Sequence, residues 1–386
     1  MKPNLNKFFL ISLLFVLLLS ACAPAQSTLT AGDPQEPAVS QNEAEPQEPE
    51  PVGDTSLAFV DATGKQVSLP ALPERIVVAG KATPYVLDTI YLFPDAANKL
   101  AALEVRGFDT QAFLELVDPN VTVKNMLERD AGPEQIAPYQ PDLVILKNIS
   151  LGKLGDALEE IAIPVMGMNL ETPAFFYEDI RALGKVFDNV DRAEEIIAYY
   201  QGREAQVNEL MSDLQDIERP SVLVLQYSED GGDISFKVPP ASYLQTTMVQ
   251  NAGGNPIWLG VDGGSDGWIQ VGLEQIAVWN PEVIFVVNYG GDSVETAGQL
   301  VQSPNWEGLQ AVDNGLVYGF PADFASWDLI DPRWILGQQW LATMLQPERA
   351  AEIDLPAQVV NFYQEMYDLT EVQIEESILP RLHEIK

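Results

Sequence analysis

The chain contains Pro133-Glu-Gln-Ile-Ala-Pro-Tyr-Gln-Pro-Asp-Leu-Val-Ile145 and, 140 positions later, Leu273-Glu-Gln-Ile-Ala-Val-Trp-Asn-Pro-Glu-Val-Ile-Phe285, two stretches that align without a gap. Each copy predicts a short helix, a break at a proline, and then an apolar run with β-branched residues that would form a buried strand. A repeated helix and strand predicts two similar lobes. Each copy also places one glutamate, Glu134 or Glu274, in the first turn of its helix.

The length of the chain agrees with two lobes, because 386 residues exceed what one hydrophobic core usually serves. At the N-terminus, Lys2 and Lys7 precede an apolar run from Phe8 to Leu19. This run is too short to span a bilayer as a helix and is typical of a signal peptide. The residues that follow, Leu19-Ser-Ala-Cys22, resemble the lipobox of bacterial lipoproteins, in which the cysteine thiol receives a diacylglycerol. The alternative is an ordinary secretory signal with an incidental cysteine.

Cys22 is the only cysteine, so the exported chain is expected to contain no disulfide and no cysteine metal site. From Ala23 to Thr55 the sequence is rich in Pro, Glu, Gln and Ser and contains no Lys or Arg. Such a segment cannot bury enough apolar surface to fold and is predicted to be a flexible acidic tether. The net charge of −36 disfavours nucleic acid and anionic lipid as surface partners.

After the tether, strand and helix patterns alternate. A hairpin is predicted over Leu57–Leu69, and short buried strands are predicted at Arg75–Ala79, Leu143–Leu146 and Ile161–Val165. Strands that alternate with helices predict a parallel sheet covered on both faces. Between the copies, apolar residues recur every three or four positions from about Tyr177 to Gln215, which predicts one long amphipathic helix, with a possible shorter helix before a break at Asp188-Asn189.

The lipobox, the tether, the Arg75-Ile-Val-Val strand, the single helix between the lobes and the repeated unit together resemble the substrate-binding lipoproteins of ABC importers. The subgroup they resemble, the helical-backbone class III periplasmic binding proteins, takes up ferric siderophores, haem or vitamin B12. The resemblance implies two Rossmann-like α/β lobes joined by one long α-helix, with a ligand cleft between them. The implied organisation is a signal peptide (1–21), a lipidated tether (22–55), an N-terminal lobe (56–172), the interlobe helix (173–218) and a C-terminal lobe (219–386).

The same resemblance implies a monomer outside the cytoplasm, anchored to the bacterial membrane, that delivers its ligand to a permease driven by an ATPase. Carried over onto this chain, Glu134 and Glu274 would each meet an arginine of the permease. A glutamate in the first turn of a helix is also favourable by itself, because the exposed amides there attract negative charge. Pro138, which stands where the second copy has Val278, should shorten or distort the first helix.

Enzymatic chemistry is mostly excluded by composition. The lone histidine, His383, lies four residues from the C-terminus. Without further His or Cys residues, no catalytic triad, zinc site or usual haem ligation is expected. We therefore expect no catalytic residue, no resident metal and no cofactor.

A cleft for a bulky chelate needs aromatic walls and a few polar groups on the loops that follow the strands. Each candidate also has a plain structural explanation, since tryptophans are often core residues and Arg333 could pair with Asp328 or Asp331. The candidates are Lys81, Tyr85, Arg106 and Lys147 in the first lobe, and Tyr227, Lys237, Trp258, Trp268, Tyr289, Trp327 and Arg333 in the second.

Three alternatives remain open beside the metal chelate. A bare metal ion usually recruits histidine, which the body of the chain lacks, and an oxyanion would need a pocket of amides and hydroxyls. A metallocluster enzyme on a similar fold would need several cysteine ligands. A surface interaction module is the third alternative.

Overall fold

The computed structural model describes residues 56–261, 267–382 and 385. The predicted signal peptide, Cys22 and the predicted tether lie outside the described residues, as does His383. Within the described part of the chain, no helix is both long enough and apolar enough to cross a membrane.

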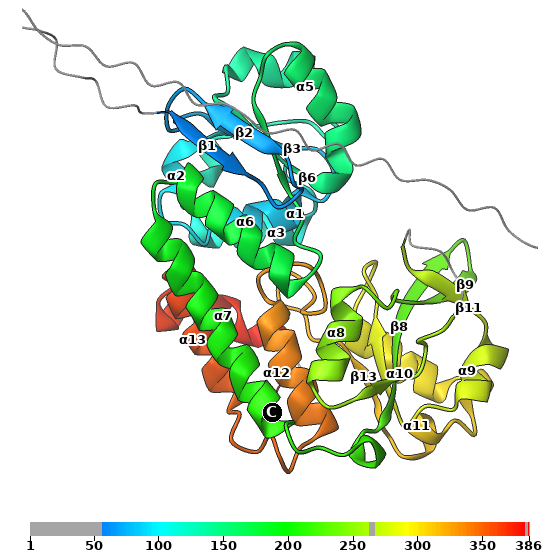
Figure 1. The fold of residues 1–386 in the computed structure, drawn as a ribbon. Coiled ribbons are helices and arrows are strands. Elements are labelled where there is room, and N and C mark those ends of the chain that lie inside the picture. Colours follow the sequence, from blue (N-terminus) through cyan, green and yellow to red (C-terminus); the bar gives the residue numbers. More distant parts are fainter. Residues whose placement is uncertain (1–55, 262–266, 383–384, 386) are drawn as a thin grey trace, which may run out of the picture. The chain divides into compact units, whose positions relative to one another are not determined.

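A five-stranded parallel sheet forms the core of the N-terminal lobe (Figure 1), in the order β5-β4-β3-β6-β7. The central strands β3 and β6 are buried at every position, as their unbroken apolar runs predict. The predicted strand at Ile161–Val165 is wrong in its position, because Ala162 adopts a left-handed turn with φ 62° and the strand begins only at Val165. The strands are Ile76–Ala79 (β3), Leu100–Leu103 (β4), Asn125–Met126 (β5), Leu143–Lys147 (β6) and Val165–Met168 (β7).

The predicted N-terminal hairpin is confirmed and consists of β1 (Leu57–Val60) and β2 (Gln66–Leu69). The Asp61 side chain fixes the turn of the hairpin and also binds the hairpin to the sheet. One carboxylate oxygen accepts the N–H groups of Thr63 and Lys65, and the other accepts the N–H of Gly167 in β7 at 2.8 Å. The helices of this lobe are Thr83–Ile90 (α1), Ala96–Lys99 (α2), Phe108–Val117 (α3), Pro133–Ile136 (α4) and Asp156–Glu160 (α5).

Two consecutive helices, α6 (Pro173–Val186) and α7 (Val190–Leu210), connect the lobes. The break predicted at Asp188-Asn189 is confirmed, because Asp188 has φ 52° and the Asn189 side chain caps α7 by accepting the N–H of Arg192. The 21-residue α7 contacts both lobes. Arg192 donates to the carbonyl of Leu92 in the first lobe, and the Tyr200 hydroxyl donates to the carbonyl of Pro332 in the second.

The second sheet has the order β11-β9-β8-β12-β13, with β10 (Asn255–Pro256) beside β8. Here the expectation of a parallel sheet is only partly right, because β9 runs antiparallel to β8 and to β11. Gly231 and Gly232, both at positive φ, turn β8 directly into β9. The strands are Ser221–Asp230 (β8), Asp233–Val238 (β9), Ile269–Val271 (β11), Val283–Val287 (β12) and Val317–Gly319 (β13).

The last helices of the chain return to the first lobe. Tyr367 of α13 packs its ring edge-to-face on Phe113 of α3, with centroids 5.0 Å apart, and its hydroxyl donates to the carbonyl of Asp88. The helices of this part are Leu244–Asn251 (α8), Leu273–Trp279 (α9), Ser293–Gln302 (α10), Gln310–Asp313 (α11), Trp334–Leu345 (α12), Leu355–Tyr367 (α13) and Glu371–Ser377 (α14).

The two copies of the repeat keep their alignment in space, since β6 begins at Leu143 and β12 at Leu143's counterpart, Val283. As Pro138 predicts, the first helix is shorter, and it ends at Ile136 before a 3-10 turn over Ala137–Tyr139. The second helix continues to Trp279. Both copies then turn through a left-handed residue, Gln140 at φ 49° and Asn280 at φ 42°.

Each copy also carries an acidic residue after its proline that ties its strand to the neighbouring one. Asp142 accepts the N–H groups of Glu74 and Arg75 just before β3, at 3.0 Å each. Glu282 accepts the N–H of Ser221 at the start of β8 at 2.6 Å, together with its hydroxyl at 3.0 Å. The repeat therefore contains a carboxylate clamp between two neighbouring parallel strands of each lobe, β3 and β6 in the first and β8 and β12 in the second.

Replacement of the half-buried Glu282 should destabilise the fold more than replacement of the exposed Asp142. For Glu282→Ala we expect the free energy of unfolding in urea to fall by about 1–2 kcal/mol, because the donors of Ser221 lose a charged acceptor. Asp142→Ala should cost less, since water can replace its exposed carboxylate. Glu307→Ala, an exposed residue of the same lobe, is the control and should be close to neutral. Equal losses for the three variants would contradict the clamp.

Candidate functional site

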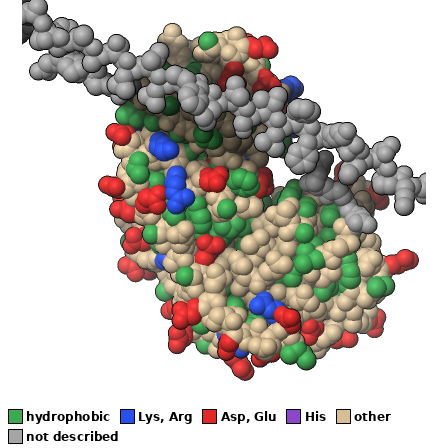
Figure 2. Space-filling view, viewed as in Figure 1, with side chains coloured by type: hydrophobic (Ala, Val, Ile, Leu, Met, Phe, Trp, Pro, Cys, Tyr) green, Lys and Arg blue, Asp and Glu red, His purple; other side chains and the backbone are tan. Residues whose placement is uncertain are grey.

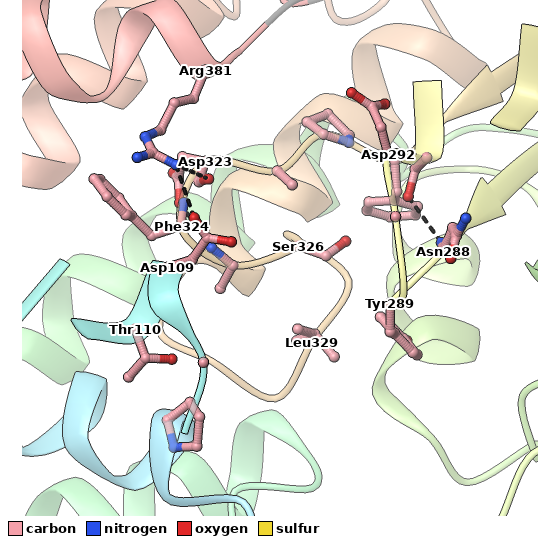
Figure 3. A pocket seen from close by; sticks show the side chains of 18 of the residues that line it. Asp109, Thr110, Asn288, Tyr289, Asp292, Asp323, Phe324, Ser326, Leu329 and Arg381 are labelled. Atoms are coloured by element: carbon pink, nitrogen blue, oxygen red, sulfur yellow. Dashed lines mark hydrogen bonds and ion pairs between the residues drawn. The ribbon is translucent and has the colours of Figure 1, made fainter. Parts of the chain in front are cut away.

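A cavity of about 550 Å³ lies between residues of the two lobes (Figure 3). The first lobe contributes the starts of α1 and α3, and the second contributes the loops that follow β12 and β13. The last turn of the chain, Pro380-Arg381, also lines it. In open α/β sheets ligands bind beyond the carboxyl ends of parallel strands, which is where these loops lie. This cavity is the candidate ligand site.

The loop after β12 is held in place by its own polar side chains. Asn288 receives a hydrogen bond from the N–H of Gly290 on its side-chain oxygen, and its side-chain amide donates to the Thr296 hydroxyl at 2.9 Å. Asp292 then caps α10 by accepting the N–H groups of Val294 and Glu295. These bonds fix the conformation of the loop that carries Tyr289.

Two of the predicted aromatic residues, Tyr85 and Tyr289, line the cavity, and a third, Trp268, lies outside the lining and packs against Tyr289. The rings of Trp268 and Tyr289 pack edge-to-face with centroids 6.1 Å apart. Tyr85 on α1 lines the cavity from the opposite lobe. Burial raises the pKa of Tyr85 well above its usual value, and the negative charge of Asp328 raises it further. Both tyrosines therefore stay neutral under ordinary conditions and present a hydroxyl and an aromatic ring.

Asp328 lies behind Tyr289 and is fully buried. Its carboxylate accepts three hydrogen bonds from neutral groups: the Tyr289 hydroxyl and the Ser326 hydroxyl, each at 2.5 Å, and the Gln245 amide at 3.2 Å. Burial raises the pKa of Asp328 above its usual range, and the three hydrogen bonds oppose that shift. No ion pair joins Asp328 to a cation in the described part of the chain.

Arg333 forms a buried ion cluster that joins the lobes. Its guanidinium is within 2.8 Å of three carboxylates and is stacked over the ring of Phe113 at 4.1 Å. Asp88 comes from α1 of the first lobe, whereas Asp323 and Asp331 come from the second. Burial raises the pKa of Asp88 well above its usual range, although Arg333 opposes the shift. Of the two partners that the sequence suggested for Arg333, Asp328 and Asp331, it pairs with Asp331. Contact between Arg333 and a ligand stays a prediction.

Arg381 and Asp109 close one side of the cavity (Figure 3). They form an ion pair at 3.1 Å, although 272 positions separate them in sequence. The Arg381 guanidinium also lies over the ring of Phe324 at 3.9 Å. The opposite side, with Asn288, Tyr289 and Asp292, belongs to the loop after β12.

The cationic candidates of the first lobe do not line this cavity. Arg106 pairs with the buried Glu104 at 2.5 Å and with Asp130 at 2.9 Å. Lys147, itself only 2% exposed, pairs with Glu171 at 2.6 Å. Lys81 is exposed, and its backbone N–H donates to the Ser150 hydroxyl.

The four remaining candidates belong to the second lobe and also lie outside the lining of the cavity. Trp258 is buried in the core, and Trp327 is fully buried and donates its indole N–H to Asp323. Tyr227 is 9% exposed, and its hydroxyl donates to Glu229 in the same strand. Lys237 is half-buried in β9 opposite Gln226 of β8. Ligand contact by these residues stays a prediction.

Sequence reasoning missed several residues that line the cavity, chiefly Asp88, Asp109 and Arg381. A signal exists for Asp88, because a carboxylate inside the apolar stretch Val86–Ile90 must find a buried partner. No local pattern indicates that Arg381 reaches Asp109 from the end of the chain.

Glu134 and Glu274 are both exposed in the first turns of α4 and α9. Each helix follows a glycine in extended conformation, Gly132 or Gly272. The two glutamates are therefore available to a partner, and their docking role stays a prediction.

The family model described as periplasmic binding protein matches residues 97–324, more than half of the chain. The chain belongs to the periplasmic binding protein family. The match confirms the resemblance drawn from the sequence, and the two α/β lobes of this periplasmic binding protein confirm the predicted fold class.

One named relative of this periplasmic binding protein is described as binding molybdate. The molybdate-binding protein MolA of Haemophilus influenzae is 24% identical over 255 residues, which cover 61% of this chain and 69% of MolA.

Solved structures of other binding proteins share the fold at low sequence identity. A periplasmic solute-binding protein of Veillonella parvula has a TM-score of 0.68 at 22% identity and covers 84% of this chain and 97% of its own. Molybdate-bound MolA has a TM-score of 0.66 at 19% identity, with 81% and 98% covered. CeuE of Helicobacter pylori in a complex with nickel and histidine has a TM-score of 0.65 at 18% identity, with 84% and 99% covered.

Asp179 on α6 supports the segment after β7, beside Lys147. Its buried carboxylate accepts the N–H groups of Asn169 and Leu170 at 2.9 and 2.8 Å, and burial raises its pKa to about 8. Between about pH 4, the usual value for an aspartate, and about pH 8, the folded protein therefore binds more protons here than the unfolded chain. This group makes the free energy of unfolding fall as the pH rises through that range.

The Asp179→Asn variant should lose part of this pH dependence, because an amide does not ionise. We expect the drop in melting temperature between pH 5 and pH 8 to be smaller than in the parent protein. Asp156→Asn, which changes an exposed carboxyl on α5, should keep the parent's dependence. An unchanged drop in Asp179→Asn would contradict the raised pKa.

Proposed function

We propose that the protein is the lipid-anchored solute-binding component of an ABC importer, which captures a metal chelate in the cavity between its lobes and delivers it to the permease. The observation that carries this proposal is a cavity at the carboxyl ends of the strands, lined by aromatic residues from both lobes, in a periplasmic binding protein. Ferric siderophore, haem and corrinoid are the chelate classes considered. Attachment to the membrane would be through Cys22.

A bare metal ion is the less favoured ligand. No group of three or more His, Cys, Asp or Glu side chains in the described part of the chain is arranged to hold a metal ion. A chelate brings its own metal ligands, so the protein needs only rings and polar groups around it.

Binding of a chelate should stabilise the folded protein. Ligand present at 100 times its dissociation constant adds about 2.7 kcal/mol to the free energy of unfolding, so the melting temperature should rise with a ferric siderophore, haem or a corrinoid. Tyr289→Ala should reduce the shift, because it removes the ring that packs on Trp268. Tyr318→Ala, which changes an aromatic residue of β13 outside the cavity lining, is the control. No shift with any chelate, or a shift with molybdate alone, would contradict the proposal.

Docking to the permease is proposed to use Glu134 and Glu274. Reversal of both charges to Arg should abolish uptake in cells while the affinity for solute is unchanged, because the two residues lie on α4 and α9 rather than in the cavity. Reversal of two other exposed glutamates, Glu307 and Glu352, is the matched control and should leave uptake near the parent level.

Normal uptake by the Glu134→Arg and Glu274→Arg double variant would disprove the docking assignment. The same cells test the anchor. The Cys22→Ser variant should leave the membrane fraction, and its retention there would contradict lipidation.

A further inference from the structure

Arg381, the one cation among the described residues that line the cavity, and Arg333, which is buried outside the lining, are already matched by carboxylates. Arg381 pairs with Asp109, and Arg333 lies among Asp88, Asp323 and Asp331. Arg106 and Lys147, which the sequence offers as ligand-binding cations, pair with Glu104 and Glu171 nearby. An anionic ligand would therefore have to compete with the protein's own carboxylates for each of these side chains.

Four lysines have no carboxylate within ion-pair distance in the described part of the chain, namely Lys81, Lys153, Lys185 and Lys237. None of them lines the cavity. Their positive charge is therefore set apart from the site where a ligand would be held.

Two carboxylates, by contrast, are bonded only to neutral groups: Asp292, which lines the cavity, and Asp328, which is buried behind Tyr289. Asp328 accepts from Tyr289, Ser326 and Gln245, and Asp292 accepts two backbone N–H groups at the start of α10. Among the described residues, neither carboxylate forms an ion pair. Their negative charge is not compensated by a protein cation.

In the Arg333 cluster one guanidinium faces three carboxyl groups, so it has no capacity left for an anionic ligand. Asp88 of this cluster lines the cavity and is only 3% exposed, and its second oxygen, Oδ1, has no hydrogen-bond partner in the described structure. A buried carboxylate oxygen without a partner is costly, and a cation or donor on a bound ligand would satisfy it.

Aromatic rings lie beside these carboxylates. Tyr85 and Tyr289 line the cavity with rings that attract cations through their quadrupoles, and Trp268 packs against Tyr289. The outer surface in Figure 2 also carries many acidic and few basic side chains, so that the approach of an anion is disfavoured before it reaches the cavity.

We propose that the cleft selects solutes of net positive charge and disfavours anionic chelates and oxyanions such as molybdate. This inference rests on the proposed function, since it names the charge class of the chelate that the same cavity would take. Uncompensated Asp292 and Asp328, the unpartnered oxygen of Asp88 and the neighbouring rings would together supply the preference.

The test uses two ferric trihydroxamates that differ by one charge. One carries a free ammonium group, and the other is its N-acetylated, neutral form. We expect calorimetry on the full chain to show at least tenfold tighter binding of the ammonium form, with the difference shrinking at high salt because of screening. A ferric triscatecholate, which is anionic, and molybdate should bind more weakly than either.

A substitution that removes one negative charge then tests which residue supplies the preference for positive charge. Asp292→Asn keeps a residue that caps helices well, so α10 should still form, but it removes one negative charge from the cavity. The preference for the ammonium form should fall at least threefold. Asp313→Asn, an exposed position on α11, should leave the preference unchanged.

The outcomes separate the two proposals. Binding of the triscatecholate as tightly as the ammonium chelate, or equal binding of the charged and acetylated pair, overturns the charge preference while chelate capture stands. Failure of every chelate to bind overturns chelate capture and, with it, the inference that depends on it.

Discussion

The buried cluster around Arg333 is the interaction on which the arrangement of the site depends. One guanidinium binds carboxylates from both lobes and stacks on Phe113, so the position of α1 relative to the second lobe is set by a charge that cannot be left unpaired. Separation of Asp88 from Arg333 would expose buried charges to an apolar surrounding, which costs several kcal/mol. Together with the contacts of α7 and α13, this cluster opposes a wide opening of the lobes and favours small rocking motions.

Local patterns made much of the fold predictable. The repeated stretches contain their own helix, proline and apolar strand, and the structure places both copies in equivalent positions with the 140-residue offset preserved. The effect of Pro138 and the break at Asp188-Asn189 were also predictable, because they depend on the backbone of a few neighbouring residues. The antiparallel hairpin of β8 and β9 was missed, although Asp230-Gly-Gly-Asp233 between the two strands is a typical hairpin turn.

The candidate site was less predictable, and the reason is physical. Loop position suggested which side chains could reach a cleft, and of these Tyr85 and Tyr289 line the cavity, whereas Trp268 packs against Tyr289 outside the lining. It did not show that Arg106 and Lys147 pair with carboxylates, or that Arg333 binds Asp88, 245 positions away, in addition to Asp331. The net charge near a ligand depends on such pairs, and a single sequence does not reveal them.

The ion pair between Arg381 and Asp109 has a consequence for the order in which the protein can mature. It joins residues 272 positions apart, and the cavity it borders also needs Tyr85 and Tyr289 from opposite lobes. Contacts this distant in sequence form late in folding, because the intervening chain must first be ordered. The first lobe can acquire its sheet early, but the cavity is complete only once Arg381 packs against Asp109.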